Sequence, residues 1–103
     1  MIARAVQYVR QNYPDKELSL ESLCQTFGVS QTQFKRETGT SFLQYLLDLR
    51  IEKAQSLLAE SNQKIYQIAE ETGFGDASYF SYCFKQRCGL SPKEFRIQRG
   101  TTG

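Results

Sequence analysis

The sequence has no histidine and no tryptophan, and its 103 residues include only three cysteines and two prolines. Histidine is the commonest general base and the commonest metal ligand in proteins, so its absence argues against an acid–base enzyme and a metal centre. An odd cysteine count without Cys-x-x-Cys spacing argues against a disulfide framework and is typical of a reducing cytoplasm. We therefore expect a cytoplasmic chain with no cofactor and no metal, in which Cys24 and Cys83 are small buried hydrophobic residues.

Long apolar runs are missing as well. No stretch approaches the roughly 20 apolar residues that cross a membrane, and nothing after Met1 reads as a signal sequence, so we expect no membrane partner. Thirteen Lys and Arg against eleven Asp and Glu leave a formal net charge of +2. This charge is too small to indicate a polyanionic partner by itself, so such a partner has to be argued from where the charges lie.

Apolar residues recur at spacings of three and four, and no alternating run is long enough for a strand. The sequence therefore predicts an all-α fold of about seven helices. Serine or aspartate precedes several of these segments as a cap, and glycine follows them. The first helix begins at residue 2 and stops at Asn12-Tyr13-Pro14, and the others span residues 20–27, 31–38, 42–59, 65–72, 77–88 and 92–96. Residues 100–103 are expected to form a frayed tail.

The chain also repeats itself. Residues 20–29 match residues 65–74, and residues 34–45 match residues 84–95. Each copy has a short amphipathic helix, a glycine turn and a capped second helix, which is the pattern of a helix-turn-helix. The small residues Cys24 and Ala69 of the first helices allow the paired helices to pack closely. Two copies joined by a long helix predict two helix-turn-helix subdomains, at 1–41 and 61–99, on a linker helix at 42–60.

With these repeats, the sequence resembles the DNA-binding domain of the AraC/XylS family of bacterial transcription regulators over about residues 6–97. The residues that carry the resemblance in the first half are Leu18 to Leu23, Lys35 to Phe42, Tyr45, Leu46 and the run Arg50 to Leu58. Those in the second half are Ile65, Ile68, Ala69, Gly73, Phe74, Asp76, Ser78 to Ser81, Phe84, Lys85, Gly89, Ser91, Pro92, Phe95 and Arg96. Residues 6–13 further resemble the start of this domain in two-component response regulators.

The resemblance implies a transcription regulator rather than an enzyme. Each helix-turn-helix unit would present a recognition helix to the major groove, on one face of double-stranded DNA. The other implied partners are RNA polymerase and an N-terminal receiver or effector-binding domain that this chain does not contain. A protein-interaction module built on a degenerate helix-turn-helix is the alternative, and salt-dependent duplex binding distinguishes the two.

In the second recognition helix, Phe80, Cys83 and Phe84 share a face that we expect to be core. The opposite face carries the candidate DNA-binding residues Ala77, Ser78, Ser81, Tyr82 and Lys85. The family commonly has glutamine where Ala77 stands and arginine where Tyr82 stands. Because this chain departs at both positions, we expect readout by apolar contact and shape, with the two serines at phosphates. Tyr79 is expected to pack at the helix start.

The first recognition helix is shorter by one turn when Gly28–Gly39 is compared with Gly73–Gly89. The residues left to reach DNA are Ser30, Gln31, Thr32, Gln33, Lys35 and Arg36. Either the helix is short and reads DNA poorly, or the sequence omits residues that the protein has. The intact frame from Phe34 to Gly39 favours omission, which an intact mass above 11.9 kDa would confirm.

Residues 83–103 hold a local charge of +4, which favours phosphate binding beside the second unit, with Arg96 as a contact. Arg50, in the middle of the linker helix, is either a surface charge or a buried partner for an acidic group. The resemblance favours a structural role for it.

Overall fold

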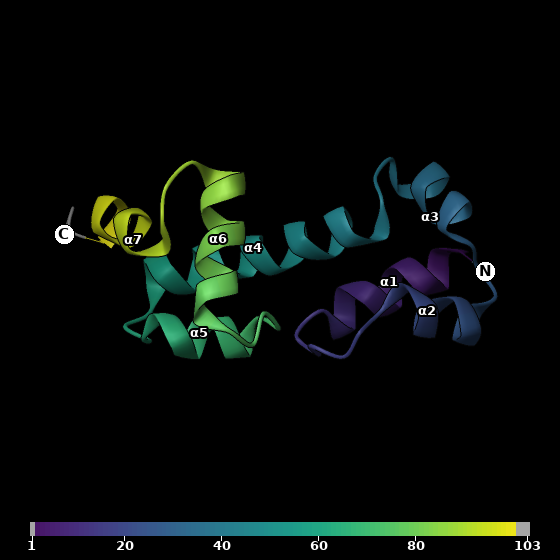
Figure 1. Cartoon of the computed structure of the whole chain (residues 1–103), viewed down its shortest axis with the longest axis horizontal. Helices are drawn as coiled ribbons and strands as arrows, with labels where there is room; N and C mark the ends of the chain where they lie inside the picture. The colour runs from purple at the N-terminus through teal and green to yellow at the C-terminus, as the bar shows by residue number, and fades with distance from the viewer. Residues whose placement is uncertain (1, 101–103) are drawn as a thin grey trace.

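A computed structural model describes residues 2–100, which form seven α-helices and contain no strand (Figure 1). The helices are α1 (Ile2–Asn12), α2 (Leu20–Phe27), α3 (Gln31–Thr38), α4 (Phe42–Glu60), α5 (Ile65–Glu71), α6 (Ala77–Cys88) and α7 (Pro92–Gly100). The all-α prediction is confirmed. Of the expected tail, Gly100 ends α7, and residues 101–103 lie outside the described part of the chain. None of the described helices is long and apolar enough to cross a membrane.

The predicted helix ends agree closely with the structure because local hydrogen bonds set them. The hydroxyls of Ser19, Ser30 and Ser41 accept the backbone N–H groups three residues on, which the first turn of a helix leaves unpaired. Gly28 and Gly39 end α2 and α3 in the left-handed conformation, which glycine adopts without strain.

Two helices are longer than predicted. α4 continues to Glu60 rather than residue 59, and α7 continues to Gly100 rather than Arg96. The backbone N–H of Ser91 donates to the Glu94 carboxylate at 2.9 Å, and the backbone N–H of Glu94 donates to the Ser91 hydroxyl at 3.1 Å. These two reciprocal hydrogen bonds form a capping box at the first turn of α7. In the part of α7 beyond the predicted end, the Arg99 guanidinium lies 5.3 Å from the centre of the Phe95 ring, one turn earlier.

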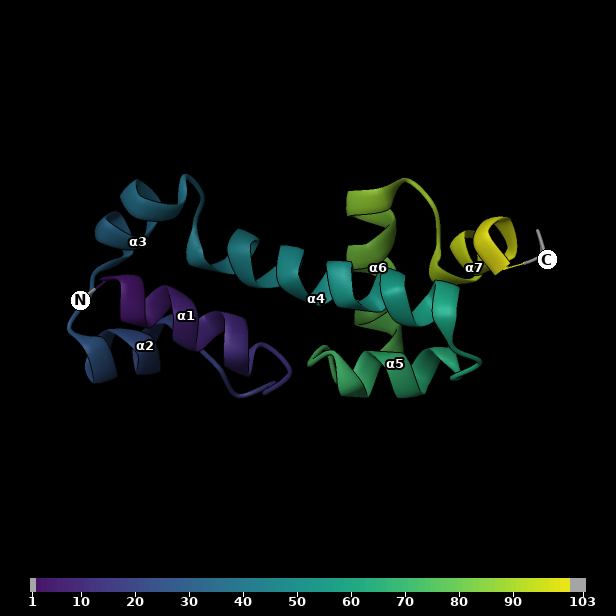
Figure 2. The same ribbon diagram turned by 180° about the vertical axis from the view of Figure 1, so that it is seen from behind.

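The molecule is elongated, measuring 46 × 22 × 21 Å, and has two hydrophobic clusters rather than one. The first cluster joins α1, α2 and α3 to the start of α4, and the second joins the rest of α4 to α5, α6 and α7. The long helix α4 connects the two groups of helices (Figure 2). Its consecutive residues Leu46 and Leu47 belong to different clusters, so both clusters pack on the same unbroken helix.

Arg50 is buried in the middle of α4, with 6% of its surface exposed. Its Nε donates to the carbonyl oxygen of Tyr13 at 2.8 Å, and its Nη2 donates to that of Asp15 at 3.0 Å. Arg50 is therefore not a surface charge. Its hydrogen bonds go to backbone carbonyls, and the Asp15 carboxylate acts on it through its charge. Burial lowers the pKa of Arg50 from its ordinary value, which is so high that the side chain remains charged.

Candidate nucleic-acid interface

The helix α6 has the two faces that the sequence predicts. Phe80, Cys83 and Phe84 are buried in the second cluster. On the opposite side Ser78, Tyr82 and Lys85 are exposed, whereas Ala77 and Ser81 are half-buried. Tyr82 is the most open of the large apolar side chains, with 65% of its surface exposed. The exposed face of α6 is thus mostly small or hydroxyl-bearing, with one cation.

Tyr79 stands at the edge of this face. Its ring packs on Phe74, with 5.9 Å between the ring centres, yet 43% of its surface is exposed. Two effects raise the pKa of Tyr79: the larger is its hydrogen bond with Cys83, and the smaller is its partial burial. Its hydroxyl therefore stays neutral. Packing at the helix start is confirmed, but the residue is not fully enclosed.

The helix α3 has eight residues and α6 has twelve, so the first recognition helix is one turn shorter. Its only fully buried side chain is Phe34, whose ring meets those of Phe42 and Tyr45. All of the predicted DNA-binding residues in this segment are exposed: Ser30, Gln31, Thr32, Gln33, Lys35 and Arg36. Phe34 thus anchors the short helix in the first hydrophobic cluster.

Two of these six side chains already have partners in the cap of α3. The Ser30 hydroxyl accepts the backbone N–H of Gln33 at 3.1 Å, and the Gln33 side-chain oxygen accepts the backbone N–H of Ser30 at 2.8 Å. The Ser-x-x-Gln spacing is a capping-box pattern that could have indicated this role in the sequence. The cap does not involve the side chains of Gln31, Thr32, Lys35 and Arg36.

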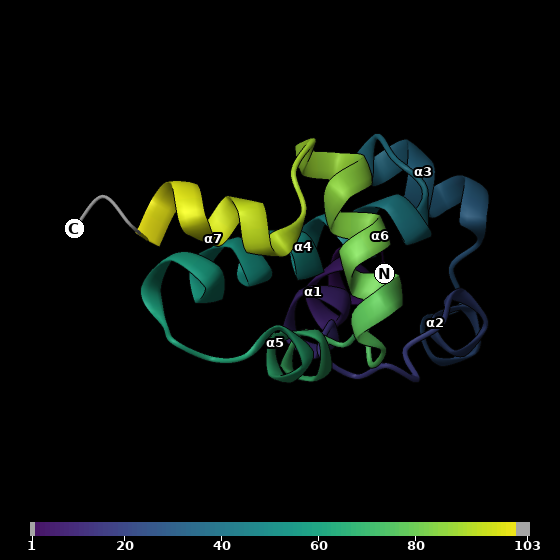
Figure 3. The same cartoon turned by 60° about the vertical axis from the view of Figure 1, so that its left-hand side comes forward.

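The two short helices α3 and α6 lie on the same side of the molecule. In the view of Figure 3 both lie on the right, whereas α7 extends to the left. Both helices can therefore contact one extended ligand along the long axis. The helix α7 runs away from that side.

Two basic side chains of residues 83–100, Arg87 and Arg96, are held by contacts within the fold. Arg87 makes an ion pair with Asp48 at 3.0 Å and also hydrogen bonds with Gln44, which attaches α6 to α4. Arg96 donates to the carbonyl oxygens of Leu58 and Ser61 at 3.2 and 3.1 Å. These are terminal carbonyls of α4, where a cation also interacts favourably with the helix dipole. Neither contact could be predicted from the local sequence pattern.

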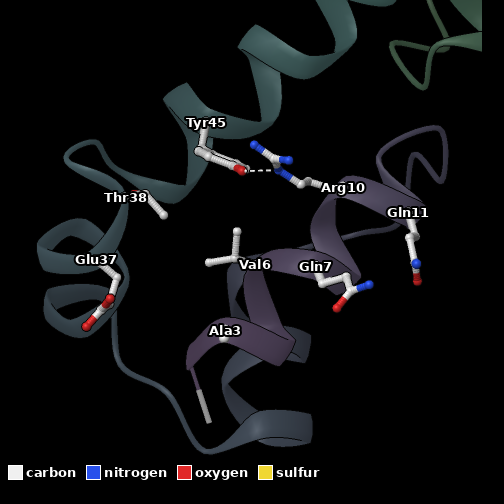
Figure 4. A pocket seen from close by; sticks show the side chains of 8 residues that line it. All are labelled: Ala3, Val6, Gln7, Arg10, Gln11, Glu37, Thr38 and Tyr45. Atoms are coloured by element: carbon white, nitrogen blue, oxygen red, sulfur yellow. Dashed lines mark hydrogen bonds between the residues drawn. The ribbon is translucent and has the colours of Figure 1, made fainter.

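A hollow of about 770 Å³ lies between α1, α3 and α4, away from the exposed face of α6 (Figure 4). Arg10 donates from Nε to the Tyr45 hydroxyl at 2.8 Å on one side of it, and Val6 points into it. Its lining residues are Ala3, Val6, Gln7, Arg10, Gln11, Glu37, Thr38 and Tyr45. None of these was a predicted site residue. Among the described residues, no group of three Cys, Asp or Glu side chains is placed to hold a metal ion.

Comparison with known proteins gives consistent matches. Residues 23–98 match a family model described as a helix-turn-helix domain. The chain is 36% identical to the HTH-type transcriptional activator RhaR of Cronobacter sakazakii, over 86% of this chain and 33% of that protein. It is 32% identical to the arabinose operon regulatory protein of Escherichia coli, over 92% of this chain and 34% of that protein. The chain therefore spans about a third of the length of these relatives.

Solved structures match nearly the whole fold. The C-terminal domain of AraT, a response regulator from Geobacillus stearothermophilus, superposes with a TM-score of 0.92 at 36% identity, over 96% of this chain and 85% of that one. The DNA-binding domain of AdpA, solved in complex with a target DNA, gives a TM-score of 0.88 at 25% identity, over 94% of this chain and 90% of that one.

Proposed function

Because this chain belongs to the AraC family of helix-turn-helix transcription regulators, we propose that it binds double-stranded DNA with α3 and α6 in successive major grooves. The observation that carries the proposal is the placement of α3 and α6 on one side of the elongated molecule, together with the exposed side chains that both helices carry. Successive major grooves on one face of B-DNA lie about 34 Å apart. The 46 Å length of the molecule is sufficient for two helices at about that separation.

The two units contribute unequally in this proposal. The first unit (α1–α3) offers Lys35 and Arg36 as cations, on a helix of eight residues whose Gln33 is held in the cap. The second unit (α5–α7) offers a helix of twelve residues with the open Tyr82 and Lys85. We therefore assign base contacts mainly to α6 and phosphate contacts mainly to α3, because phosphate contacts position a protein without reading sequence.

We assign Arg96 a smaller contribution to phosphate binding than the sequence alone predicts. Its guanidinium is shared between two backbone carbonyls, and α7 extends away from the side that carries α3 and α6. In the longer regulator that we propose, an N-terminal receiver or effector-binding domain precedes this chain, and RNA polymerase is the partner of the bound complex. The threefold greater length of the relatives supports the additional domain.

A salt titration of duplex binding tests the proposal. Each phosphate contact contributes about −0.9 to the slope of log K against log salt. We expect Lys85→Ala and Lys35→Ala each to flatten the slope by about one unit. Lys93→Ala is the matched control, since Lys93 is exposed on α7, and it should leave the slope unchanged.

The same titration on a scrambled duplex separates base from phosphate contacts. Tyr82→Ala should change the preference between the two duplexes at an unchanged slope, because its single hydroxyl and ring face the groove floor. If the parent binds neither duplex at low salt, or if both lysine variants keep the parent slope, the protein-interaction alternative replaces DNA binding.

A further inference from the structure

The two units touch each other directly as well as through α4. The loop that follows α1 in the first unit lies beside the turn between α5 and α6 in the second (Figures 1 and 2). Arg50 reaches from α4 into this junction, where it donates to the carbonyl oxygens of Tyr13 and Asp15. On its other side, the guanidinium lies 6.0 Å from the centre of the Phe74 ring. One buried side chain therefore contacts both units.

Gly73 lets the two units approach this closely. A Cβ at this position would lie 2.5 Å from the carbonyl oxygen of Tyr13 and 3.0 Å from that of Pro14. It would also lie 2.8 Å from the Arg50 Nε. Real Cβ atoms do not approach backbone at such distances, so any side chain at Gly73 would push the loop of the first unit away. Gly73 also has φ +100°, a conformation that favours glycine.

The neighbouring glycine provides a contrast. Gly75 lies in the same turn with φ +82°, so it has a similar conformational requirement. A Cβ there would meet only the Lys16 side chain, at 3.5 Å, which is ordinary van der Waals contact. Of the two glycines, Gly73 is the one that a substitution would bring into collision with the first unit.

We propose that Arg50 and Gly73 are positioning residues that clamp the first unit against the second and thereby set which spacing between two DNA half-sites the chain accepts. This inference rests on the proposed binding of both units to DNA. With the clamp in place, the helix α4 and the loop contact connect the units at two separate points, and relative rotation is restricted. Without the clamp, α4 alone connects them.

Fixed orientation matters because DNA is helical. Inserting one base pair between two half-sites moves the second by about 3.4 Å and turns it by about 35°. A clamped pair of units cannot follow this change and loses the contacts of one unit. A pair joined by α4 alone can rotate toward the displaced groove, so it should tolerate the insertion.

The test compares Gly73→Ala and Arg50→Met with the matched control Gly75→Ala. The probes are a duplex that the parent chain selects from a random pool, and the same duplex with one base pair inserted between its half-sites. The insertion should weaken binding of the parent and of Gly75→Ala by about tenfold or more, which is the cost of losing the DNA contacts of one unit. It should weaken binding of Gly73→Ala and Arg50→Met by less than about threefold.

A second measurement needs no DNA. Residual dipolar couplings of the backbone amides should fit one common alignment for both units in the parent and in Gly75→Ala. In Gly73→Ala and Arg50→Met, the couplings of the first unit and those of the second unit should fit two different alignments, while each unit remains folded.

The outcomes are distinct. If the residual dipolar couplings of both Gly73→Ala and Arg50→Met still fit one common alignment, as in the parent, the clamp is overturned. If the couplings change but the variants still bind the duplex with the inserted base pair as weakly as the parent does, the role of the clamp in half-site spacing is overturned. A parent that binds no duplex would overturn the proposed function, while the couplings would still decide whether the clamp exists.

Discussion

The fully buried rings of the second cluster are the side chains on which α6 depends. Phe84 has no exposed surface, and its ring centre lies 5.7 Å from that of Phe80 and 5.3 Å from that of Phe95. Truncation would remove these contacts and leave a cavity. We expect Phe84→Ala to lower the free energy of unfolding by about 3–5 kcal/mol, measured by urea denaturation. Tyr82→Ala, on the exposed face of the same helix, should stay within about 0.5 kcal/mol of the parent, and an equal loss in both would contradict the two faces.

A second prediction at the residue scale concerns Glu94. Hydrogen bonds from the backbone N–H and the hydroxyl of Ser91 lower the pKa of the Glu94 carboxyl. A carboxyl whose pKa is lower in the folded state stabilises the fold above its unfolded pKa of about 4.3, and this stabilisation is lost as the pH falls. The melting temperature of Glu94→Gln should therefore fall less between about pH 5 and pH 3 than that of the parent. Parallel curves over this range would contradict the capping role.

Among the elements, α3 is a short helix that depends on its cap. Its eight residues are far below the length at which a helix is stable alone, and Phe34 is its one fully buried anchor. Ser30→Ala removes a cap that is worth about 1 kcal/mol. We expect faster amide hydrogen exchange along the whole of α3 in this variant.

Ser41→Ala is the control for that experiment. Its hydroxyl makes the same cap, accepting the N–H of Gln44 at 3.2 Å, but it begins a helix of 19 residues. Only the first turn of α4 should exchange faster. If Ser30→Ala were also limited to the first turn, α3 would be stabilised by tertiary packing rather than by its cap.

The elements could be predicted from the sequence because their ends are local. A serine, the N–H three residues on and a terminal glycine are close in the chain, and the apolar spacing of three and four defines the buried face. The extension of α7 beyond Arg96 was missed, although Phe95 and Arg99 are four residues apart, which is the spacing of neighbours on a helix. The exposed faces of α3 and α6 also followed directly from that spacing.

The roles of the arginines were harder to predict. Arg50, Arg87 and Arg96 bind backbone or side-chain groups more than 30 residues away, and nothing in the local pattern distinguishes them from surface charges. The roles of these three arginines therefore follow only from the three-dimensional contacts. Gln33 is different, since its capping partner is local and the pattern was present.

At the scale of the whole molecule, two clusters on one helix imply two regions of partly independent stability. α1, α2 and α3 contribute only to the first cluster, and α5, α6 and α7 only to the second. We expect Phe84→Ala to accelerate hydrogen exchange in α5–α7 and to leave the amides of α1–α3 at the parent rate, as read by mass spectrometry of peptides. Uniform acceleration along the chain would show instead that the clusters unfold as one unit.

The four-residue difference between α3 and α6 has a consequence for how such a domain can change its length. An α-helix repeats every 3.6 residues, so a loss of four returns the following side chains almost to their original direction. Phe34 keeps its place in the core, whereas a loss of two would turn it toward water. The same arithmetic applies to α4, where one inserted residue would rotate half of the molecule by about 100°. Viable insertions and deletions in these helices should therefore come in whole turns, and the reach between the two halves should evolve in steps of about 5.4 Å.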